Sequence, residues 1–321
     1  MHAAEFSAQP RSRSSCPSSP PFGYSTPHRR PAFGHCLRAA AVLACLLPAS
    51  GCVDLTAVSK FASQSSQALT EGQPVLEDIA ASCIRAHLVA MPVPTDNRQL
   101  FDPGLQAQAA ADPACAAYTS EQPGELALLK VLTDYFTALS QLAATGTAST
   151  GKSSSSSAKS AKDKSSEPEN VLNAAGSLAD FLGKIAAGGY RARQLEKDLK
   201  DRKDDVAAVV AGLKDIVQSR YEGNSLVREQ QVVTATDSDL VGNSTDPALK
   251  ALYRTQWQGA MDSIAQKRAA ADAFVKALDT MQSGYEALCN APNLKAKDVP
   301  GIIQPYTDSL SSLIPSIQKA L

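Results

Sequence analysis

Apolar residues recur along this chain in alternating steps of three and four positions, which is the spacing of one face of an α-helix. The pattern runs for more than six heptads from Val171 to Ile216 and returns between Tyr253 and Leu288. Shorter stretches with the same spacing run from Leu55 to Cys83 and from Leu128 to Leu142. A repeat that averages 3.5 residues is typical of helices that pack like coiled coils. The sequence therefore predicts an amphipathic helix in each of these four segments.

These segments predict an all-α fold, an elongated up-and-down bundle of four or five helices with coiled-coil-like packing. Asp246 and Pro247 precede the Tyr253 segment as an N-cap and a first-turn proline, so the two longest helices should form a long antiparallel hairpin. A last amphipathic segment, about residues 300–321, contains Pro305 and Pro315 and should be a kinked fifth helix. No run alternates with period two for long enough to predict a sheet.

The predicted helices differ in length and straightness. At 1.5 Å per residue the first spans roughly 45 Å and the helix that starts at Val171 roughly 70 Å, so the hairpin should reach beyond the earlier helices unless residues 88–118 cap it. Gly72-Gln73-Pro74 predicts a bend in the first helix, and Gly188-Gly189 predicts another in the third.

One polar residue interrupts each of the two long apolar seams, Arg202 in the first and Lys267 in the second. If the hairpin turns near residue 234, these two residues face each other, and two cations share one layer. Unpaired buried charges are unfavourable, so the layer needs carboxylates or water, and Asp205 and Asp272 are the nearest candidates. The layer is interpreted as a device that fixes the register of the helices, or alternatively as a small anion-binding site.

Residues 145–170 separate the second and third helices and consist almost entirely of Ser, Thr, Ala, Lys and acidic residues. Such a segment buries too little apolar surface to order itself, so we expect a disordered Ser/Lys-rich loop. Residues 146–153 within it match the G-x-x-x-x-G-K-[ST] pattern of P-loops. That chemistry needs a strand before the motif and a helix after it. Because a helix precedes it and a serine tract follows, no nucleotide site is expected.

The N-terminal residues have a different character. Residues 1–36 are rich in Pro, Ser and Arg and predict a disordered leader; one interpretation is a misassigned start, with translation beginning near Leu37. The apolar run from Ala39 to Leu47 is too short to cross a bilayer and follows Arg38, which is typical of a signal peptide. It continues into Leu46-Leu47-Pro48-Ala49-Ser50-Gly51-Cys52, which resembles the lipobox of bacterial lipoprotein precursors.

This resemblance implies an export route and an anchor. In that family the chain is cut before the cysteine, so residues 37–51 would be the signal peptide and Cys52 would carry lipid such as palmitate. Val53, rather than Asp, follows the cysteine, and this favours the outer membrane of a Gram-negative bacterium, with the protein facing the periplasm. Residues 52–321 would then form a single helical periplasmic domain.

The charge and histidine content of residues 52–321 excludes several function classes. Residues 1–51 hold five of the 31 basic and one of the 32 acidic residues, which leaves 26 basic and 31 acidic and a net charge of −5. No nucleic-acid partner follows from this balance. His87 is the one histidine left, so we expect no catalytic triad, metal site or cofactor. We interpret His87 as an ordinary polar residue of the protein surface.

Three cysteines remain beside Cys52: Cys83, Cys115 and Cys289. In an up-and-down bundle Cys83 ends the first helix and Cys115 precedes the second, so both lie at the same end. Cys289 ends a helix at the opposite end. We therefore expect a Cys83–Cys115 disulfide and a reduced Cys289.

Together these features predict a lipid-anchored, non-enzymatic envelope protein that acts as a structural or binding module for an unknown envelope partner. An alternative is a helical membrane-perturbing or pore-forming protein, because residues 171–188 are apolar over a wide face. Burial among neighbouring helices explains that width as well, and is favoured. A bundle-core enzyme is disfavoured because no Glu-x-x-His pair or paired carboxylates lie on an apolar face.

Overall fold

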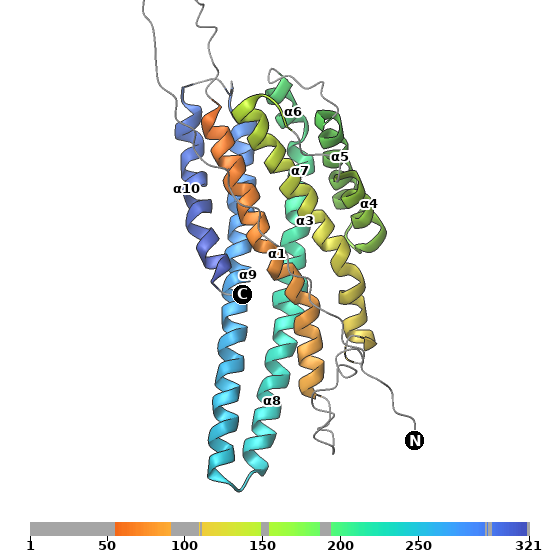
Figure 1. Cartoon of the computed structure of the whole chain (residues 1–321), viewed down its shortest axis with the longest axis vertical. Helices are drawn as coiled ribbons and strands as arrows, with labels where there is room; N and C mark the ends of the chain where they lie inside the picture. Colours follow the sequence, from red (N-terminus) through yellow and green to blue (C-terminus); the bar gives the residue numbers. More distant parts are fainter. Residues whose placement is uncertain are drawn as a thin grey trace, which may run out of the picture. The chain divides into compact units, whose positions relative to one another are not determined.

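The apolar stripes become the buried faces of packed helices in the structure, a computed structural model (Figure 1). It describes residues 55–90, 109, 111–148, 154–186, 194–292, 294 and 297–319. Over these residues the fold is all-α and contains no strand, as predicted. The helices, with the π-helix η3 among them, are α1 (Thr56–Ala90), α3 (Pro113–Thr145), α4 (Ser154–Lys164), α5 (Glu169–Ala186), α6 (Leu195–Asp201), α7 (Lys203–Asp215), η3 (Ile216–Leu226), α8 (Val227–Asn243), α9 (Pro247–Asn290) and α10 (Val299–Gln318).

Helices α1 and α3 pack antiparallel, and the predicted seam positions of both are buried. The Oγ atoms of Ser59 and Ser140 lie 3.2 Å apart, and Ser66 Oγ lies 2.7 Å from Thr137 Oγ1. In both pairs an early residue of α1 meets a late residue of α3, which sets the antiparallel register. Asp112 caps α3 by accepting a hydrogen bond from the Ala114 amide at 2.8 Å.

The prediction of one continuous helix from Val171 to Ile216 is wrong. Helix α5 ends at Ala186, α6 begins at Leu195, and α5 packs antiparallel on α7. Ser177 donates a hydrogen bond to Asp205 at 2.7 Å across this pair. The apolar period does not reveal this reversal of the chain, because α5 and α7 both bury a face with the same apolar spacing in one core. The predicted bend at Gly188-Gly189 lies outside the described residues.

The prediction of a disordered loop at 145–170 also needs correction, because Ser154–Lys164 form α4. Helix α4 packs on α3 and buries Ala158 and Ala161. Gly124 of α3 has no side chain, and a Cβ there would lie 2.5 Å from the Ser165 backbone nitrogen. Composition underestimates such a helix because small side chains bury little surface but allow close approach of two backbones.

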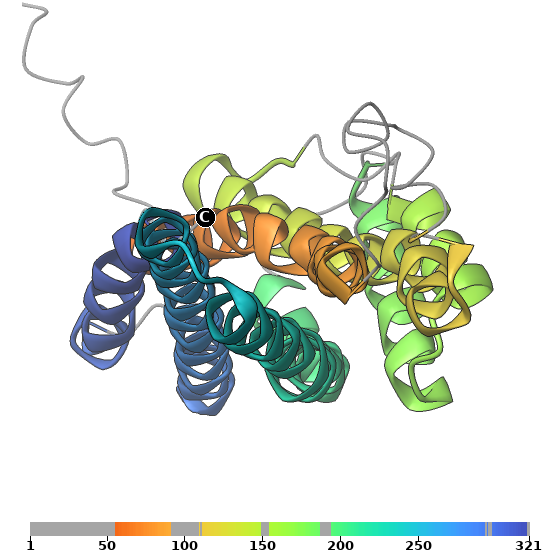
Figure 2. The same cartoon turned by 90° about the horizontal axis from the view of Figure 1, so that it is seen from below.

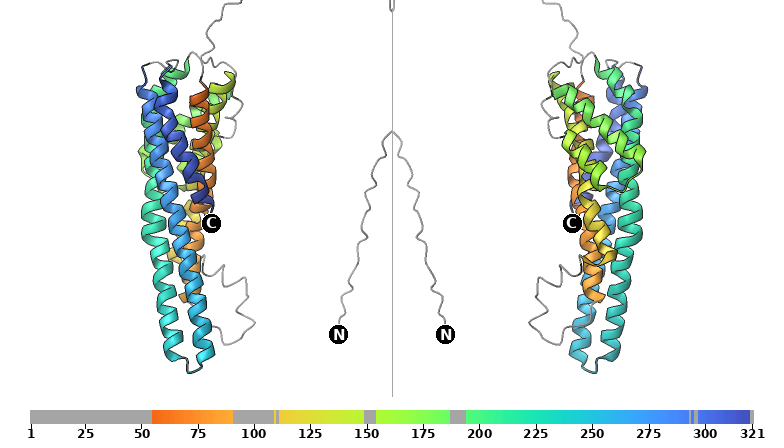
Figure 3. Two further views of the ribbon diagram at one scale, coloured as in Figure 1. Left: turned by 90° about the vertical axis from the view of Figure 1, so that its left-hand side faces the viewer. Right: turned by 90° about the vertical axis from the view of Figure 1, so that its right-hand side faces the viewer.

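From α6 to α8 the helical elements follow one another over residues 195–243, and this line pairs antiparallel with α9. Asp246 caps α9 as predicted, since its side chain accepts a hydrogen bond from the Ala248 amide at 2.8 Å. Seen from below, α8, α9 and α10 lie in one row and α1 lies across them (Figure 2). The far part of the α8–α9 hairpin extends past the neighbouring helices (Figure 3).

An aromatic cluster marks the opposite end of the bundle from the hairpin turn. The hydroxyl groups of Tyr135 and Tyr285 lie 2.5 Å apart, and the Phe61 and Phe136 rings meet edge to face. A Cβ on Gly284 would lie 2.4 Å from the Phe61 ring, so the end of α9 is packed tightly against the start of α1. Pro74 lies inside α1, at the predicted bend, and α10 continues through both of its prolines.

Candidate functional site

The predicted disulfide between Cys83 and Cys115 is confirmed, with a Cα–Cα distance of 5.6 Å. Cys289 is free, as predicted; it is also buried, and its Sγ donates to the Leu199 carbonyl at 3.4 Å. Burial raises the pKa of the Cys289 thiol to about 11, so it stays protonated at neutral pH. Cys52 lies outside the described residues. His87 is half-buried, and its Nε2 lies 3.6 Å from Asp112 Oδ2.

Arg202 and Lys267 do not share a layer, so that prediction is wrong. Arg202 pairs with Asp205 at 3.0 Å, as expected for its carboxylate, and lies over the Phe181 ring. Tyr285 and Cys289 both donate to the Leu199 carbonyl, three residues before Arg202, so Arg202 lies opposite about residues 282–286 of the antiparallel helix α9. These residues are about 22–28 Å along α9 from Lys267.

The physical reason is the length of α8. It continues to Asn243, and the hairpin turns at residues 244–246 rather than near residue 234. Antiparallel pairing of this line with α9 is therefore correct, but the hairpin turn lies about 11 residues, or about three helical turns, further along the chain than predicted.

Lys267 instead joins a set of charges that we call the basal ion cluster, in which Glu229 is buried and Asp78, Arg85 and Lys267 are half-buried. It links α1, η3, α8 and α9 where the hairpin leaves the bundle. Arg85 Nε donates to Glu229 at 2.7 Å and its Nη atoms to Asp78 at 2.7 and 2.9 Å. Lys267 Nζ lies 3.5 Å from Asp78 and 3.8 Å from Glu229. The Tyr221 hydroxyl donates to Asp78 at 2.6 Å. Two carboxylates thus balance two cations, and their ion pairs hold the base of the hairpin against α1.

A second set, the Arg220 cluster, is not balanced. Arg220 contacts Glu121 and lies 2.8 Å from Glu125 and 3.2 Å from Glu167. Burial raises the pKa of Glu125 to about 7, because Arg220 offsets only part of the desolvation and the other two carboxylates repel its charge. Burial raises the pKa of Glu167 as well. The cluster therefore binds and releases a proton near neutral pH.

The π-helix η3 positions both clusters. Its consecutive residues Arg220 and Tyr221 reach different clusters, Arg220 toward α3 and the residues before α5, and Tyr221 toward α1. π-helical turns are rare and occur often near functional sites. No sequence signal indicated this element, because a period of 3.5 residues continues into it without a break.

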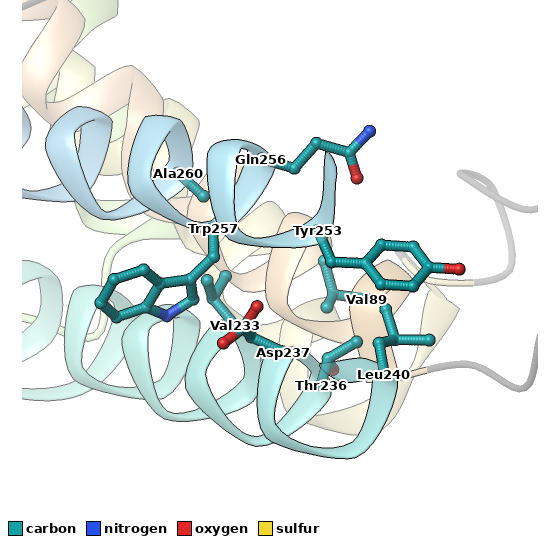
Figure 4. A pocket seen from close by; sticks show the side chains of 9 residues that line it. All are labelled: Val89, Val233, Thr236, Asp237, Leu240, Tyr253, Gln256, Trp257 and Ala260. Atoms are coloured by element: carbon teal, nitrogen blue, oxygen red, sulfur yellow. The ribbon is translucent and has the colours of Figure 1, made fainter. Parts of the chain in front are cut away.

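Beyond the basal ion cluster lies an open groove, which we call the hairpin groove (Figure 4). Its volume is about 200 Å³. Here α9 faces α8 and only the end of α1 among the described helices, so Tyr253 and Trp257 are only half-buried, and no residue from 230 to 263 is buried. The lining comes from α1, α8 and α9: Val89, Val233, Thr236, Asp237, Leu240, Tyr253, Gln256, Trp257 and Ala260.

Two polar atoms in this groove are shielded from solvent and have no hydrogen-bond partner in the described part of the chain, Asp237 Oδ1 and Trp257 Nε1. Leu240, which lines the groove, is 38% exposed, and Leu252, which precedes the lining residue Tyr253 in α9, is 50% exposed. Sequence reasoning found Trp257 as a seam position and expected burial. It missed Asp237, which only pairing of the two helices brings beside the indole.

The wide apolar face of residues 171–188 is explained by burial, as favoured. Leu178 and Leu182 of α5 are fully covered, and Phe181 and Ile185 are nearly so. Among the helices that the structure describes, none combines the length and the apolar character that a membrane crossing requires.

The P-loop-like motif begins directly after α3, at Gly146, and a helix rather than a strand precedes it, as expected. Contrary to expectation, a helix also follows it, α4. Comparison of the chain with models of known families, with curated proteins and with solved structures finds no match.

Proposed function

We propose that this protein is a lipid-anchored component of the bacterial cell envelope whose helical unit is a binding module. The observation that carries the proposal is the hairpin groove, where α8 and α9 continue a coiled-coil seam that, among the described helices, only the end of α1 at Val89 borders. Helical grooves of this kind are commonly filled by an amphipathic helix of a partner. The hairpin is clamped at its base by the ion cluster, so its far part is presented as a defined surface.

The position of the groove supports an anchored binding module. Cys52 precedes the first residue of α1 by four positions, so a lipid there would lie within about 14 Å of it. The contact of Gly284 with Phe61 places that end of the unit about 60 Å along α9 from the hairpin turn. We propose that a lipid-modified Cys52 holds the protein at the outer membrane and that the groove is used in the periplasm.

The anchor is tested with Cys52→Ser. We expect the variant to leave the membrane fraction and to lose labelled palmitate, because the lipid-bearing sulfur is gone. Cys289→Ala is the matched control and should stay membrane-bound and labelled. Continued membrane association of Cys52→Ser without label would contradict the proposal.

The binding surface is tested by photocrosslinking in cells. A photoreactive amino acid at Leu252, exposed beside the groove, should give a discrete adduct with an envelope protein, and one at Ser311 on α10 should not. Trp257→Ala should remove the adduct. A pore-forming activity would require α5 to leave its packing, so release of dye from liposomes by the full-length protein would favour that alternative instead.

A further inference from the structure

We infer that the hairpin groove receives a lysine or arginine side chain carried on an amphipathic helix of a partner protein, held between the Asp237 carboxylate and the Trp257 ring. This inference rests on the proposed function of the groove. It adds the chemistry of the partner, which the following features of the groove specify.

The first feature is the carboxylate of Asp237. Its Oδ1 is shielded from solvent and accepts no hydrogen bond within the described chain. A carboxylate oxygen removed from water without a donor is unfavourable, and a cationic donor compensates it best. The described residues supply several such donors to Asp78 and Glu229 in the basal ion cluster, but none of them donates to Asp237.

The second feature is the aromatic surroundings of that carboxylate. Trp257 and Tyr253 of α9 lie on either side of Asp237 of α8 (Figure 4). A cation near an aromatic face gains attraction from the ring, and Trp is the most favourable ring for this contact. A carboxylate beside two aromatic side chains suits a cation on an apolar stem, as in lysine and arginine.

The third feature favours a helix over a free small cation. The groove lies between two antiparallel helices, and Val89, Val233 and Leu240 offer apolar surface for neighbouring side chains of a docked helix. Residues 230–263 carry four acidic residues, including Asp237, against Lys250 and Arg254. This net charge of −2 favours a basic partner. A docked helix also brings polar side chains to Trp257 Nε1, which has no acceptor among the residues that the structure describes.

Trp257 is the only tryptophan of the chain, so its fluorescence reports on the groove alone. The full-length protein is titrated with a designed 21-residue amphipathic helix that carries one central arginine. A second peptide carries citrulline there, which keeps the shape and removes the charge. We expect the arginine peptide to change the Trp257 fluorescence and to bind at least tenfold more tightly than the citrulline peptide.

Asp237→Asn should abolish this preference, because it removes the charge but keeps the size of the side chain. Asp239→Asn, on the exposed face of the same helix, is the matched control and should preserve it. Equal binding of the two peptides would overturn the inference and leave the groove as a helix-binding surface. Binding of neither peptide would overturn the proposed function as well. A fluorescence change with protein concentration alone would identify a second copy as the occupant and also overturn the inference.

Discussion

Glu125 is fully buried beside Glu121 and Glu167, and all three carboxylates form ion pairs with the same residue, Arg220. Its pKa is raised from 4.5 to about 7, first by burial and then by the neighbouring carboxylates, with Arg220 acting in the opposite direction. The folded state therefore keeps a proton that the unfolded chain releases. The free energy of unfolding should fall as the pH rises from about 4.5 to 7 and stay low above that.

Glu125→Gln should remove this part of the pH dependence. The amide cannot ionise, so the variant should be more stable than the parent by about 1–3 kcal/mol at pH 8 and nearly equal to it at pH 4. Urea unfolding between pH 4 and pH 8 measures the difference. Asp262→Asn on the exposed face of α9 should leave the pH dependence unchanged. A variant that is less stable than the parent at pH 8 would show that Glu125 is held charged by Arg220.

At the scale of elements, the contact between α3 and the end of α4 depends on one missing side chain. A Cβ on Gly124 would lie 2.5 Å from the Ser165 nitrogen and 2.7 Å from the Lys164 carbonyl carbon. Both are backbone atoms, so relief requires movement of a whole segment. Gly183 in α5 is different, because a Cβ there meets nothing within 4 Å.

Gly124→Ala should therefore destabilise the protein by about 1–3 kcal/mol and release α4 from α3. Gly183→Ala is the matched control and should stabilise it by roughly 0.5–1 kcal/mol, since alanine restricts the unfolded chain. Urea unfolding measures the free energies, and amide hydrogen exchange reports on α4. If Gly124→Ala is as stable as the parent, residues 154–164 do not pack on α3, and the disordered loop expected from composition is correct.

At the scale of the whole molecule, the far part of the hairpin contributes surface rather than core. Residues 230–263 contain no buried side chain, and the nearest buried layers are those of Glu229 and Ile264. A two-helix hairpin without a covered face gains little from folding. Its stability comes from continuity with the clamped base.

Deletion of residues 237–243 and 247–253 removes two turns from each arm and keeps residues 244–246 as the turn. Because seven residues preserve the seam register, the free energy of unfolding should change by less than about 1 kcal/mol. The shortened protein should fail to bind the arginine peptide, since Asp237 is lost. A loss of several kcal/mol would show that the hairpin is part of the folding core.

Local pattern alone was sufficient for the class of fold and for several contacts. The seams of α1 and α3 were predicted as they are buried, the Asp246 cap was recognised, and the ends of two antiparallel helices predicted the Cys83–Cys115 disulfide. These features depend on residues near in sequence, or on helix ends that any up-and-down connection brings together. The helical period of apolar residues, which shows where helices begin and end, is therefore sufficient to predict them.

The tertiary structure alone decided where helices reverse and which residues face one another. A heptad pattern is the same in one long helix and in two that fold back, so it could not separate α5 from α6 or place the hairpin turn at 244–246. That displacement separated Arg202 from Lys267 and brought Asp78, Arg85 and Glu229 to Lys267 instead. It also left Trp257 and Asp237 together in an uncovered groove. Pairing between distant segments depends on the lengths of all the intervening helices and on the positions of the turns between them. The spacing of apolar residues within one segment contains no information about either.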